Sequence, residues 1–588
     1  MNKREVFKSA VVALSAMLFM TIAFAKGGAF KAQYKSNELL VKFKSDVTQS
    51  EALTVLEDMG VDLKESLGLT FGEYYLVRTD VMISFDSAMT AMSGHPSIEF
   101  AEPNFLYYAI DDETPMEKIL RETYSENLTM ATPTDPKFGL LWGLNNNGIN
   151  EPDRKGKRSS TKGVAGADIS ALKAWGITQG SSDITISIID TGVQYNHPDL
   201  EDNMWTNTAE LNGKDGVDDD GNGYVDDIHG YDFANSDGDP MDDHSHGTHV
   251  AGTIGATHDN GIGVAGVMRK VKMVGVKFLT GSGSGSLSDA VKAIDYSIKI
   301  DVDIMSNSWG GGGYSKALEE AIVRAKDSGI VFVAAAGNSS TNNDQRPHYP
   351  SNYNVENIIS VAAHNSSDQL ASFSCYGATT VHVAAPGRNI LSTVKDSEYA
   401  VYSGTSMAAP HVTGALGLLL SNEGSMSLAS VKERVMATSE YVSSYRRKMI
   451  SHGRLNAYNL LIDRRPERKM PKDSDWKELA LKSSFESSHP YDKNQTLSRV
   501  FEVSGAKYIR VVLKKYDTEE RYDNIVVRDP VSRADVESIS GSGDNYKSDY
   551  VEGSKIEVEF KSDYSLNMYG FVIEKIEYVP GDKHLAAN

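Results

Sequence analysis

Buried strands alternate with helices through the middle of this 588-residue chain, and no other feature constrains the fold as much. The apolar runs 184–189, 271–276 and 303–308 have the length and composition of buried strands. Residues 288–300 and 315–326 follow such runs and have helical periodicity. This order predicts an α/β fold, in which helices cover both faces of a parallel sheet and functional residues lie at strand ends.

A serine at the start of a predicted helix is the candidate nucleophile. Ser406 follows Gly404 and Thr405 and leads into the small and apolar residues 408–420. Gly404 permits a tight turn, and threonine is a residue type that caps helices. The hydroxyl would then stand at the positive end of a helix, where a developing anion is stabilised. Taken alone, these residues would indicate only a capped helix.

Asp, His and Ser follow one another in an order that separates classes of hydrolase. Asp190 ends the run 184–189, His246 lies in a His-Gly-Thr-His motif, and Ser406 comes last. This is the order of subtilisin, not that of chymotrypsin or the α/β-hydrolases. The hydrolase motif also needs Gly where this chain has Ala408, which disfavours a lipase or esterase. Spacing alone leaves His249 open as the base, or as a metal ligand together with His246.

With Ala335-Ala336-Gly337-Asn338 as a fourth motif, the chain resembles a subtilisin-like serine protease, a subtilase. The resemblance extends from about Asp135 to Leu461. It implies a triad in which the histidine takes the proton of the serine, and an oxyanion hole to which the backbone N–H of the serine contributes. The site residues implied are the triad Asp190, His246 and Ser406, the oxyanion residue Asn338, and the substrate-binding strand Ser308, Trp309 and Gly310.

The resemblance is less informative about specificity. His348 precedes Tyr349-Pro350 at the bottom of the first specificity pocket, where many relatives have Gly. Its side chain either narrows that pocket or turns outward, and the sequence leaves both orientations open.

An acidic loop between Asp190 and His246 is a candidate cation site. Asp218, Asp220 and Asn222 place oxygen atoms at alternate positions before a glycine, as in an EF-hand. The twelfth position is His229 rather than Glu, and a solvated acidic loop is the alternative interpretation. Because subtilases carry calcium loops of this type, the resemblance implies Ca2+ ligands among Asp218, Asp220, Asn222, Tyr224 and Asp227.

The resemblance also implies a second Ca2+ site, in which side chains and carbonyl oxygens of a glycine-containing loop face one aspartate. Without the resemblance, this loop would be interpreted only as a turn. The implied ligands are Asp199, Asn260, Ile262 and Val264.

The N-terminal end has the pattern of a secretory signal peptide. Lys3 and Arg4 precede the apolar run 10–25, which ends in Ala-Phe-Ala, and we expect cleavage after residue 25. No later segment is long and apolar enough to span a bilayer. Cys375 is the only cysteine, so no intrachain disulfide can form.

Residues 26–110 are predicted to form an inhibitory propeptide. Their strand and helix patterns follow the order βαββαβ and end in Glu102-Pro103-Asn104, which resembles the propeptide of subtilases. An unrelated small α+β domain is the alternative. The polar segment 111–136 is expected to be a linker in which processing occurs.

Residues 137–462 are expected to form the catalytic domain, and the charged segment 463–480 a second linker. Residues 481–580 show alternating β-branched and aromatic residues, which predict a β-sandwich. Short motifs make this region resemble a CUB domain, although the usual disulfides are absent. The resemblance implies calcium at Glu519, Asp523 and Asp563.

The formal net charge of −21 argues against nucleic acid and membrane surfaces as partners. We expect a calcium-dependent serine endopeptidase that is exported to a periplasm or the medium. It is expected to be monomeric, to be made as an inactive precursor, and to bind protein substrates and its own propeptide. The alternative from another class is a secreted binding protein with an inactive protease fold, and the intact catalytic motifs argue against it.

Overall fold

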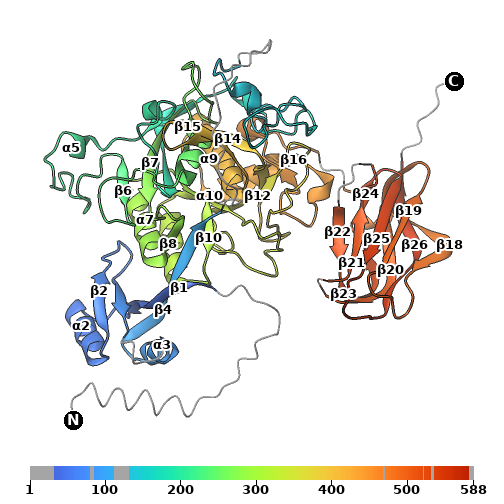
Figure 1. Cartoon of the computed structure of the whole chain (residues 1–588), viewed down its shortest axis with the longest axis horizontal. Coiled ribbons are helices and arrows are strands. Elements are labelled where there is room, and N and C mark those ends of the chain that lie inside the picture. The colour runs from blue at the N-terminus through green and yellow to red at the C-terminus, as the bar shows by residue number, and fades with distance from the viewer. Residues whose placement is uncertain are drawn as a thin grey trace. The chain divides into compact units, whose positions relative to one another are not determined.

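The computed structural model describes residues 32–79, 85–110, 132–467, 470–520, 522–531 and 535–581 (Figure 1). The expected signal peptide and residues 111–131 of the expected linker lie outside these ranges. The chain divides into two compact units. The first comprises Met1–Ser439 and Leu455–Arg464, and the second Glu440–Arg454 and Arg465–Asn588. No helix among the described residues combines the length and the apolar character needed to cross a membrane.

The first unit begins with a small α+β domain, drawn in blue in Figure 1. Its antiparallel strands lie in the order β4-β1-β3-β2. Leu39 and Val41 of β1, Leu56 of α2 and Met92 of α3 share a buried core. The elements follow the predicted order βαββαβ: β1 (Tyr34–Phe43), α2 (Gln49–Asp58), β2 (Asp62–Ser66), β3 (Tyr74–Arg78), α3 (Phe85–Ser93) and β4 (Ile98–Ala109).

The larger part of the first unit is an α/β domain built on a parallel sheet. The parallel strands lie in the order β13-β12-β11-β9-β5-β7-β6. Their bounds are β5 (Gly180–Asp190), β6 (Gly230–Asp232), β7 (Lys270–Lys277), β9 (Ile304–Asn307), β11 (Val331–Ala335), β12 (Ile358–His364) and β13 (Val383–Pro386). The shorter strands are β8 (Ser284–Ser286), β10 (Trp309–Gly311), β14 (Ile390–Val394) and β15 (Glu398–Tyr402).

Helices cover both faces of this sheet. Along β11, Val331 and Val333 point into one buried cluster and Phe332 into another, because side chains alternate across a strand. Helices α6 and α9 pack in the first cluster, and α7 and α8 in the second. This confirms the predicted fold class. The helices are η1 (Phe138–Leu140), α4 (Ala171–Ala174), η2 (Glu201–Asn203), α5 (Thr208–Leu211), α6 (His246–Gly255), α7 (Leu287–Lys299), α8 (Lys316–Asp327), α9 (Thr405–Glu423), α10 (Leu428–Thr438) and α11 (Ala457–Leu461).

The second unit contains a β-sandwich. One antiparallel sheet has the order β18-β26-β20-β23 with β24 beside β20, and the other the order β19-β25-β21-β22. Both contribute side chains to one core. The elements are β16 (Glu440–Tyr441), η3 (Ser443–Tyr445), β17 (Gly453–Arg454), η4 (Asp473–Asp475), β18 (Lys477–Glu486), β19 (Thr496–Glu502), β20 (Ala506–Thr518), β21 (Asn524–Arg528), β22 (Asp535–Ile539), β23 (Gly541–Lys547), β24 (Val551–Glu552), β25 (Lys555–Lys561) and β26 (Gly570–Pro580).

Contacts between residues far apart in the sequence place two segments near the expected domain boundaries. Residues 440–454, expected in the catalytic domain, group with the second unit, where the Arg446 guanidinium lies 3.1 Å from the carboxylate of Asp549. Strand β18 begins at Lys477, inside the expected linker, because its first residues pair with β26. Both placements depend on partners far away in the sequence.

Candidate active site

Asp190 and His246 meet at the carboxyl end of the parallel sheet. Asp190 is the last residue of β5, and His246 is the first residue of α6. Nδ1 of His246 lies 2.7 Å from Oδ1 of Asp190, and both side chains are fully buried. Because a carboxylate only accepts, the imidazole carries its proton on Nδ1. In the neutral ring, Nε2 is then the atom that can accept a proton.

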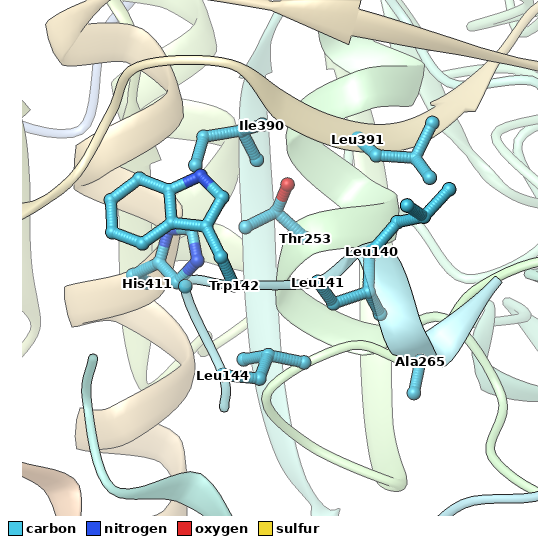
Figure 2. A pocket seen from close by; sticks show the side chains of 10 residues that line it. Leu140, Leu141, Trp142, Leu144, Thr253, Ala265, Ile390, Leu391 and His411 are labelled. Atoms are coloured by element: carbon cyan, nitrogen blue, oxygen red, sulfur yellow. The ribbon is translucent and has the colours of Figure 1, made fainter. Parts of the chain in front are cut away.

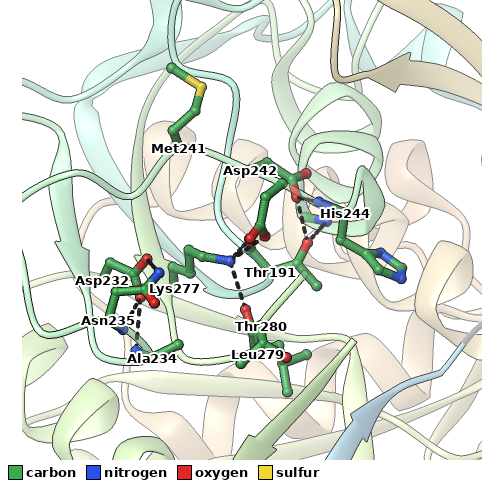
Figure 3. A network of polar contacts seen from close by, with 12 residues as sticks. Thr191, Asp232, Ala234, Asn235, Met241, Asp242, His244, Lys277, Leu279 and Thr280 are labelled. Atoms are coloured by element: carbon green, nitrogen blue, oxygen red, sulfur yellow. Dashed lines mark hydrogen bonds and ion pairs between the residues drawn. The ribbon is translucent and has the colours of Figure 1, made fainter. Parts of the chain in front are cut away.

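Asp242, which no sequence motif indicated, holds the start of α6 in place (Figure 3). Its carboxylate accepts the Thr248 N–H at 3.0 Å and the Thr191 hydroxyl at 2.9 Å. The Thr191 oxygen in turn accepts the N–H of Gly247 at 2.9 Å. A Cβ at Gly247 would lie 2.0 Å from the Gly192 carbonyl oxygen, so only glycine allows this approach. Asp242 precedes the N-cap Ser245, outside the positions at which local sequence signals a helix start, so no such signal identified it.

A buried lysine supports the same loop from the end of β7. The ammonium of Lys277 donates to the carbonyl oxygens of Thr191 and Leu279, both at 2.8 Å. It also forms an ion pair with Asp243 at 2.6 Å. Three acceptors therefore satisfy the three ammonium protons, which is what a buried charge requires.

Ser406 and Asn338 converge on one carbonyl group. Ser406 is the second residue of α9, and its hydroxyl contacts the carbonyl oxygens of Ile110 and, at 2.8 Å, of Ser308. Nδ2 of Asn338 donates to the same Ile110 oxygen at 3.2 Å. Oδ1 of Asn338 accepts the N–H of Thr405 at 2.9 Å and its hydroxyl at 3.0 Å. These bonds fix the amide so that its N–H groups face the carbonyl.

The Ile110 carbonyl reaches this point because β4 lies between β8 and β10 as an added antiparallel strand. Residues 107–109 pair with 309–311 of β10, and residues 106–108 pair with 284–286 of β8. The Ile110 N–H donates to the Ser308 carbonyl at 3.3 Å. The predicted substrate-binding strand, Ser308 to Gly310, therefore holds the end of the N-terminal domain.

His348 turns inward, which decides between the two orientations left open by the sequence. A Cβ on Gly310 would lie 2.2 Å from the His348 ring and 3.0 Å from Cδ1 of Ile110. A Cβ on Gly337 would lie 2.9 Å from the same ring. The imidazole therefore fills space between two glycines, next to the Ile110 side chain. Burial lowers the pKa of His348 to about 4, so the ring is neutral at pH 7.

His249, open from the sequence as a base or metal ligand, belongs to the core. Its Nε2 lies 3.0 Å from the carbonyl oxygen of Ile390 and 3.2 Å from that of Ala400. Its ring stacks on Tyr402 with centroids 4.5 Å apart. Burial lowers its pKa to about 3. These contacts leave His246 as the candidate base.

Asp199 and Asn260 meet as the sequence implied, with Nδ2 of Asn260 2.7 Å from Oδ1 of Asp199. The N–H of Val264 donates to Oδ2 of Asp199 at 2.9 Å, and that of Ile262 to Oδ1 of Asn260 at 3.0 Å. Burial and, to a smaller extent, the charge of Asp135 raise the pKa of Asp199 to about 6. A buried carboxylate that also feels a second negative charge is an environment that a bound cation would stabilise. Asp135 lies at the edge of the region that resembles a subtilase. The sequence did not indicate it as a ligand, because only folding brings it near Asp199.

Glu210, absent from the predicted ligands, lies at the centre of the acidic loop. Its carboxylate accepts the backbone N–H of Asp219 at 2.7 Å and of Asp226 at 2.9 Å. Ligand oxygens of Glu210, Asp218 and Asp220 all lie within 4.8 Å of one another. This like-charged oxygen cluster fits Ca2+, whose ligands are oxygen atoms. Glu210 precedes the loop, so the EF-hand spacing gave no reason to include it.

The other predicted ligands of this loop have partners of their own. Nδ2 of Asn222 lies 3.0 Å from Oδ2 of Asp227, which also accepts the Tyr296 hydroxyl at 2.7 Å. The Tyr224 ring packs edge-on against Tyr296 with centroids 4.9 Å apart. The side chain of Tyr224 is therefore part of the core.

A third carboxylate cluster lies in the second unit. Ligand oxygens of Glu519, Asp523 and Asp563 lie within 4.8 Å of one another, which brings together the residues implied by the CUB resemblance. Asp523 is buried, and its Oδ1 accepts the N–H of Asp563 at 2.7 Å.

An apolar cavity that is lined in part by His411 of α9 does not belong to this site (Figure 2). Trp142, Ile390, Leu391 and His411 are among the side chains that line it, and its volume is about 20 Å³. That volume holds about one water molecule and is too small for a peptide side chain.

Comparisons with known proteins cover most of the first unit. The Subtilase family matches residues 181–469, and the Fervidolysin N-terminal prodomain matches residues 21–104. The Thermophilic serine proteinase of Bacillus sp. (strain AK1) is 32% identical over 430 residues, which are 73% of this chain and 88% of that protein. Thermitase of Thermoactinomyces vulgaris is 38% identical over 298 residues, 49% of this chain and 92% of that protein. Subtilisin E of Bacillus subtilis (strain 168) is 37% identical over 283 residues, 48% of this chain and 66% of that protein.

Proposed function

The chain belongs to the subtilase family and is a serine endopeptidase, and we propose that Ser406 is its nucleophile and His246 its general base. One observation carries this assignment: the Ile110 carbonyl lies against both the Ser406 hydroxyl and the Asn338 amide. A hydroxyl has one proton, so the Ser406 O–H must turn from the carbonyl oxygens toward Nε2 of His246 before attack. Asp190 would hold the imidazole in this tautomer and stabilise its charged form.

The reaction follows from these positions. Oγ of Ser406 attacks the peptide carbonyl carbon while its proton moves to Nε2 of His246. The negative charge that develops on the carbonyl oxygen is stabilised by Nδ2 of Asn338 and by the backbone N–H of Ser406. The bond to the leaving nitrogen then breaks, and that nitrogen takes the proton from His246. Water releases the acyl group by the same steps in reverse order.

We propose further that the protein is made as a zymogen and cuts itself after Ile110. The N-terminal prodomain places β4 where a substrate strand would lie, so it blocks the site until it is removed. Residue 111 follows the carbonyl that the candidate nucleophile contacts, which supports Ile110–Asp111 as the scissile bond. Substrates are proteins or peptides that bind as the same added strand.

Calcium and export complete the proposal. Asp135, Asp199 and Asn260 would hold one structural Ca2+, together with carbonyl oxygens of Ile262 and Val264. The acidic loop would hold another through Glu210, Asp218 and Asp220. The N-terminal pattern supports export, and the β-sandwich with its Glu519 cluster supports a CUB-like domain.

An inactive binding protein is the alternative, and labelling by a fluorophosphonate separates the two. We expect the self-processed wild type to be labelled and Ser406→Ala to remain unlabelled. Asn338→Ala should bind substrate normally and lose about 10²–10³ in kcat. Unlabelled wild-type protein that cleaves no peptide would favour the binding protein.

A further inference from the structure

A polar pocket of about 260 Å³ lies in the catalytic domain and is not used by the mechanism above. Its lining includes Asp153, Arg154, Phe373, Arg388, Asn389 and Ser403. These residues come from loops that lie far apart in the sequence, so no motif indicated the pocket.

The pocket walls are connected to both segments that carry the groups contacting the Ile110 carbonyl. On one wall Ser403, just before Ser406, accepts the N–H of Asn389 at 2.9 Å. On another wall the Phe373 carbonyl accepts the N–H of Ser340 at 2.8 Å, and Ser340 follows closely after Asn338. No described residue of β4 lines the pocket. Strand β4 fills the acyl side of the site, so the leaving-group side is the part of the cleft to which we assign the pocket.

Two arginines and one acidic residue line the pocket, although the chain as a whole is acidic. A further carboxylate, that of the buried Glu151, does not line the pocket and accepts the Nδ2–H of Asn389 at 2.7 Å. Arg154 and Arg388 are both exposed, and within the described ranges neither guanidinium forms an ion pair. Asp153 is the acidic residue of this lining. Its Oδ1 already accepts two backbone hydrogen bonds, from the N–H groups of Lys155 and Lys157, each at 2.9 Å. Guanidinium groups donate two parallel hydrogen bonds to a carboxylate, so a pair of arginines suits the binding of acidic side chains.

We propose that this pocket binds acidic side chains on the leaving-group side of the scissile bond, so that the enzyme prefers substrates with Asp or Glu after the cleavage point. The proposal rests on the proposed function. The chain itself carries such a sequence, because Ile110 is followed by Asp111-Asp112-Glu113. Arg154 and Arg388 are specificity residues and take no part in bond breaking.

Two fluorogenic peptides test the proposal with the self-processed full-length protein. Both carry Tyr-Tyr-Ala-Ile before the scissile bond, followed by Asp-Asp-Glu in one and by Asn-Asn-Gln in the other. We expect kcat/KM to be about three- to tenfold higher for the acidic peptide at low salt, and this ratio to fall as salt is added. In the double variant Arg154→Gln/Arg388→Gln the ratio should approach one. Arg324→Gln, which removes an exposed arginine on α8, should keep the wild-type ratio.

The outcomes separate this proposal from the one on which it rests. A wild-type ratio of one, or a ratio that the double variant retains, overturns the acidic preference while cleavage of the neutral peptide leaves the protease assignment standing. If neither peptide is cut and fluorophosphonate does not label Ser406, both proposals fail together.

Discussion

Single side chains divide into those that local sequence predicts and those that only distant partners explain. Asp190, His246, Ser406 and Asn338 lie in short motifs at strand or helix ends, so the sequence alone could single them out as candidates. Asp242 was missed because its acceptor role depends on Thr191, in a loop far away in the sequence. The orientation of His348 could not be predicted either, since it depends on space left by glycines on two other segments.

The first residue-scale prediction concerns His348. Its ring lies next to the Ile110 side chain, and we expect it to limit the residue before the scissile bond to compact aliphatic side chains. His348→Gly should raise kcat/KM for peptides with Phe at that position by about tenfold or more relative to Ile. His348→Asn, which keeps a side chain there, should show a smaller change. An unchanged Phe-to-Ile ratio in His348→Gly would show that the ring does not limit the pocket.

The second residue-scale prediction concerns buried histidines. Burial lowers the pKa of His382 to about 3, whereas the ordinary value is 6.5. Between these values the unfolded chain binds a proton that the native state excludes. The free energy of unfolding therefore falls as the pH drops below about 6.5, by up to about 1.4 kcal/mol per pH unit for such a group. His258 and His411, whose pKa values burial lowers to about 4, act in the same direction.

His382→Asn tests this linkage. Nδ1 of His382 accepts the Ser360 N–H at 2.9 Å, and an asparagine oxygen can take its place without titrating. Melting temperatures measured in the Ser406→Ala background, which prevents self-digestion, should fall less between pH 7 and pH 5 in His382→Asn than in its parent. Equal falls in the two proteins would mean that His382 is not a buried neutral group.

At the scale of elements, β4 and the acidic loop show which structural features the sequence pattern predicts and which contacts it does not. The strand pattern and the Glu-Pro-Asn ending predicted a propeptide strand, but they did not predict which helices it contacts. In the structure, Glu102 accepts the N–H of Lys316 at 2.9 Å and of Ala317 at 3.1 Å, so it caps the start of α8. The acidic loop was predicted from its aspartates, whereas Glu210 required knowledge of the fold.

Loss of this cap should loosen the prodomain. Removing a helix cap costs about 1–2 kcal/mol, so Glu102→Ala should weaken the hold of the prodomain on the active site by about tenfold. In the full-length protein, we expect peptide-cleaving activity to appear correspondingly sooner after refolding. Glu99→Ala is the matched control, because it removes ion pairs of an exposed carboxylate with Lys316 and Lys42 and no helix cap. If peptide-cleaving activity appears after the same delay in Glu102→Ala and Glu99→Ala, Glu102 does not act as a cap of α8.

The acidic loop should make stability depend on calcium. A ligand that binds only the native state stabilises it by about 2.7 kcal/mol at a hundredfold excess over its Kd. We therefore expect a chelator to lower the Tm of the Ser406→Ala protein, and Glu210→Gln, Asp218→Ala and Asp220→Ala each to reduce that drop. In the active enzyme these substitutions should leave kcat nearly unchanged, because the loop supplies no catalytic group. A Tm indifferent to chelator would exclude the calcium proposal.

At the scale of the whole molecule, the alternation of strands and helices was enough to predict the α/β fold. Both faces of a parallel sheet must be covered, so few other architectures suit this pattern. The grouping of residues 440–454 with the second unit was not predictable in the same way. It depends on the buried Arg446, whose partner Asp549 lies about a hundred residues further on.

The central claim is that Ser406 cuts the bond after Ile110, which its own prodomain presents to it. Intact-mass spectrometry of purified full-length wild type and Ser406→Ala tests this most directly. The account predicts a wild-type fragment that begins at Asp111, a released prodomain that ends at Ile110, and an intact Ile110–Asp111 bond in Ser406→Ala. The same cleavage in Ser406→Ala, or processed wild-type protein in which this bond is intact, would contradict it.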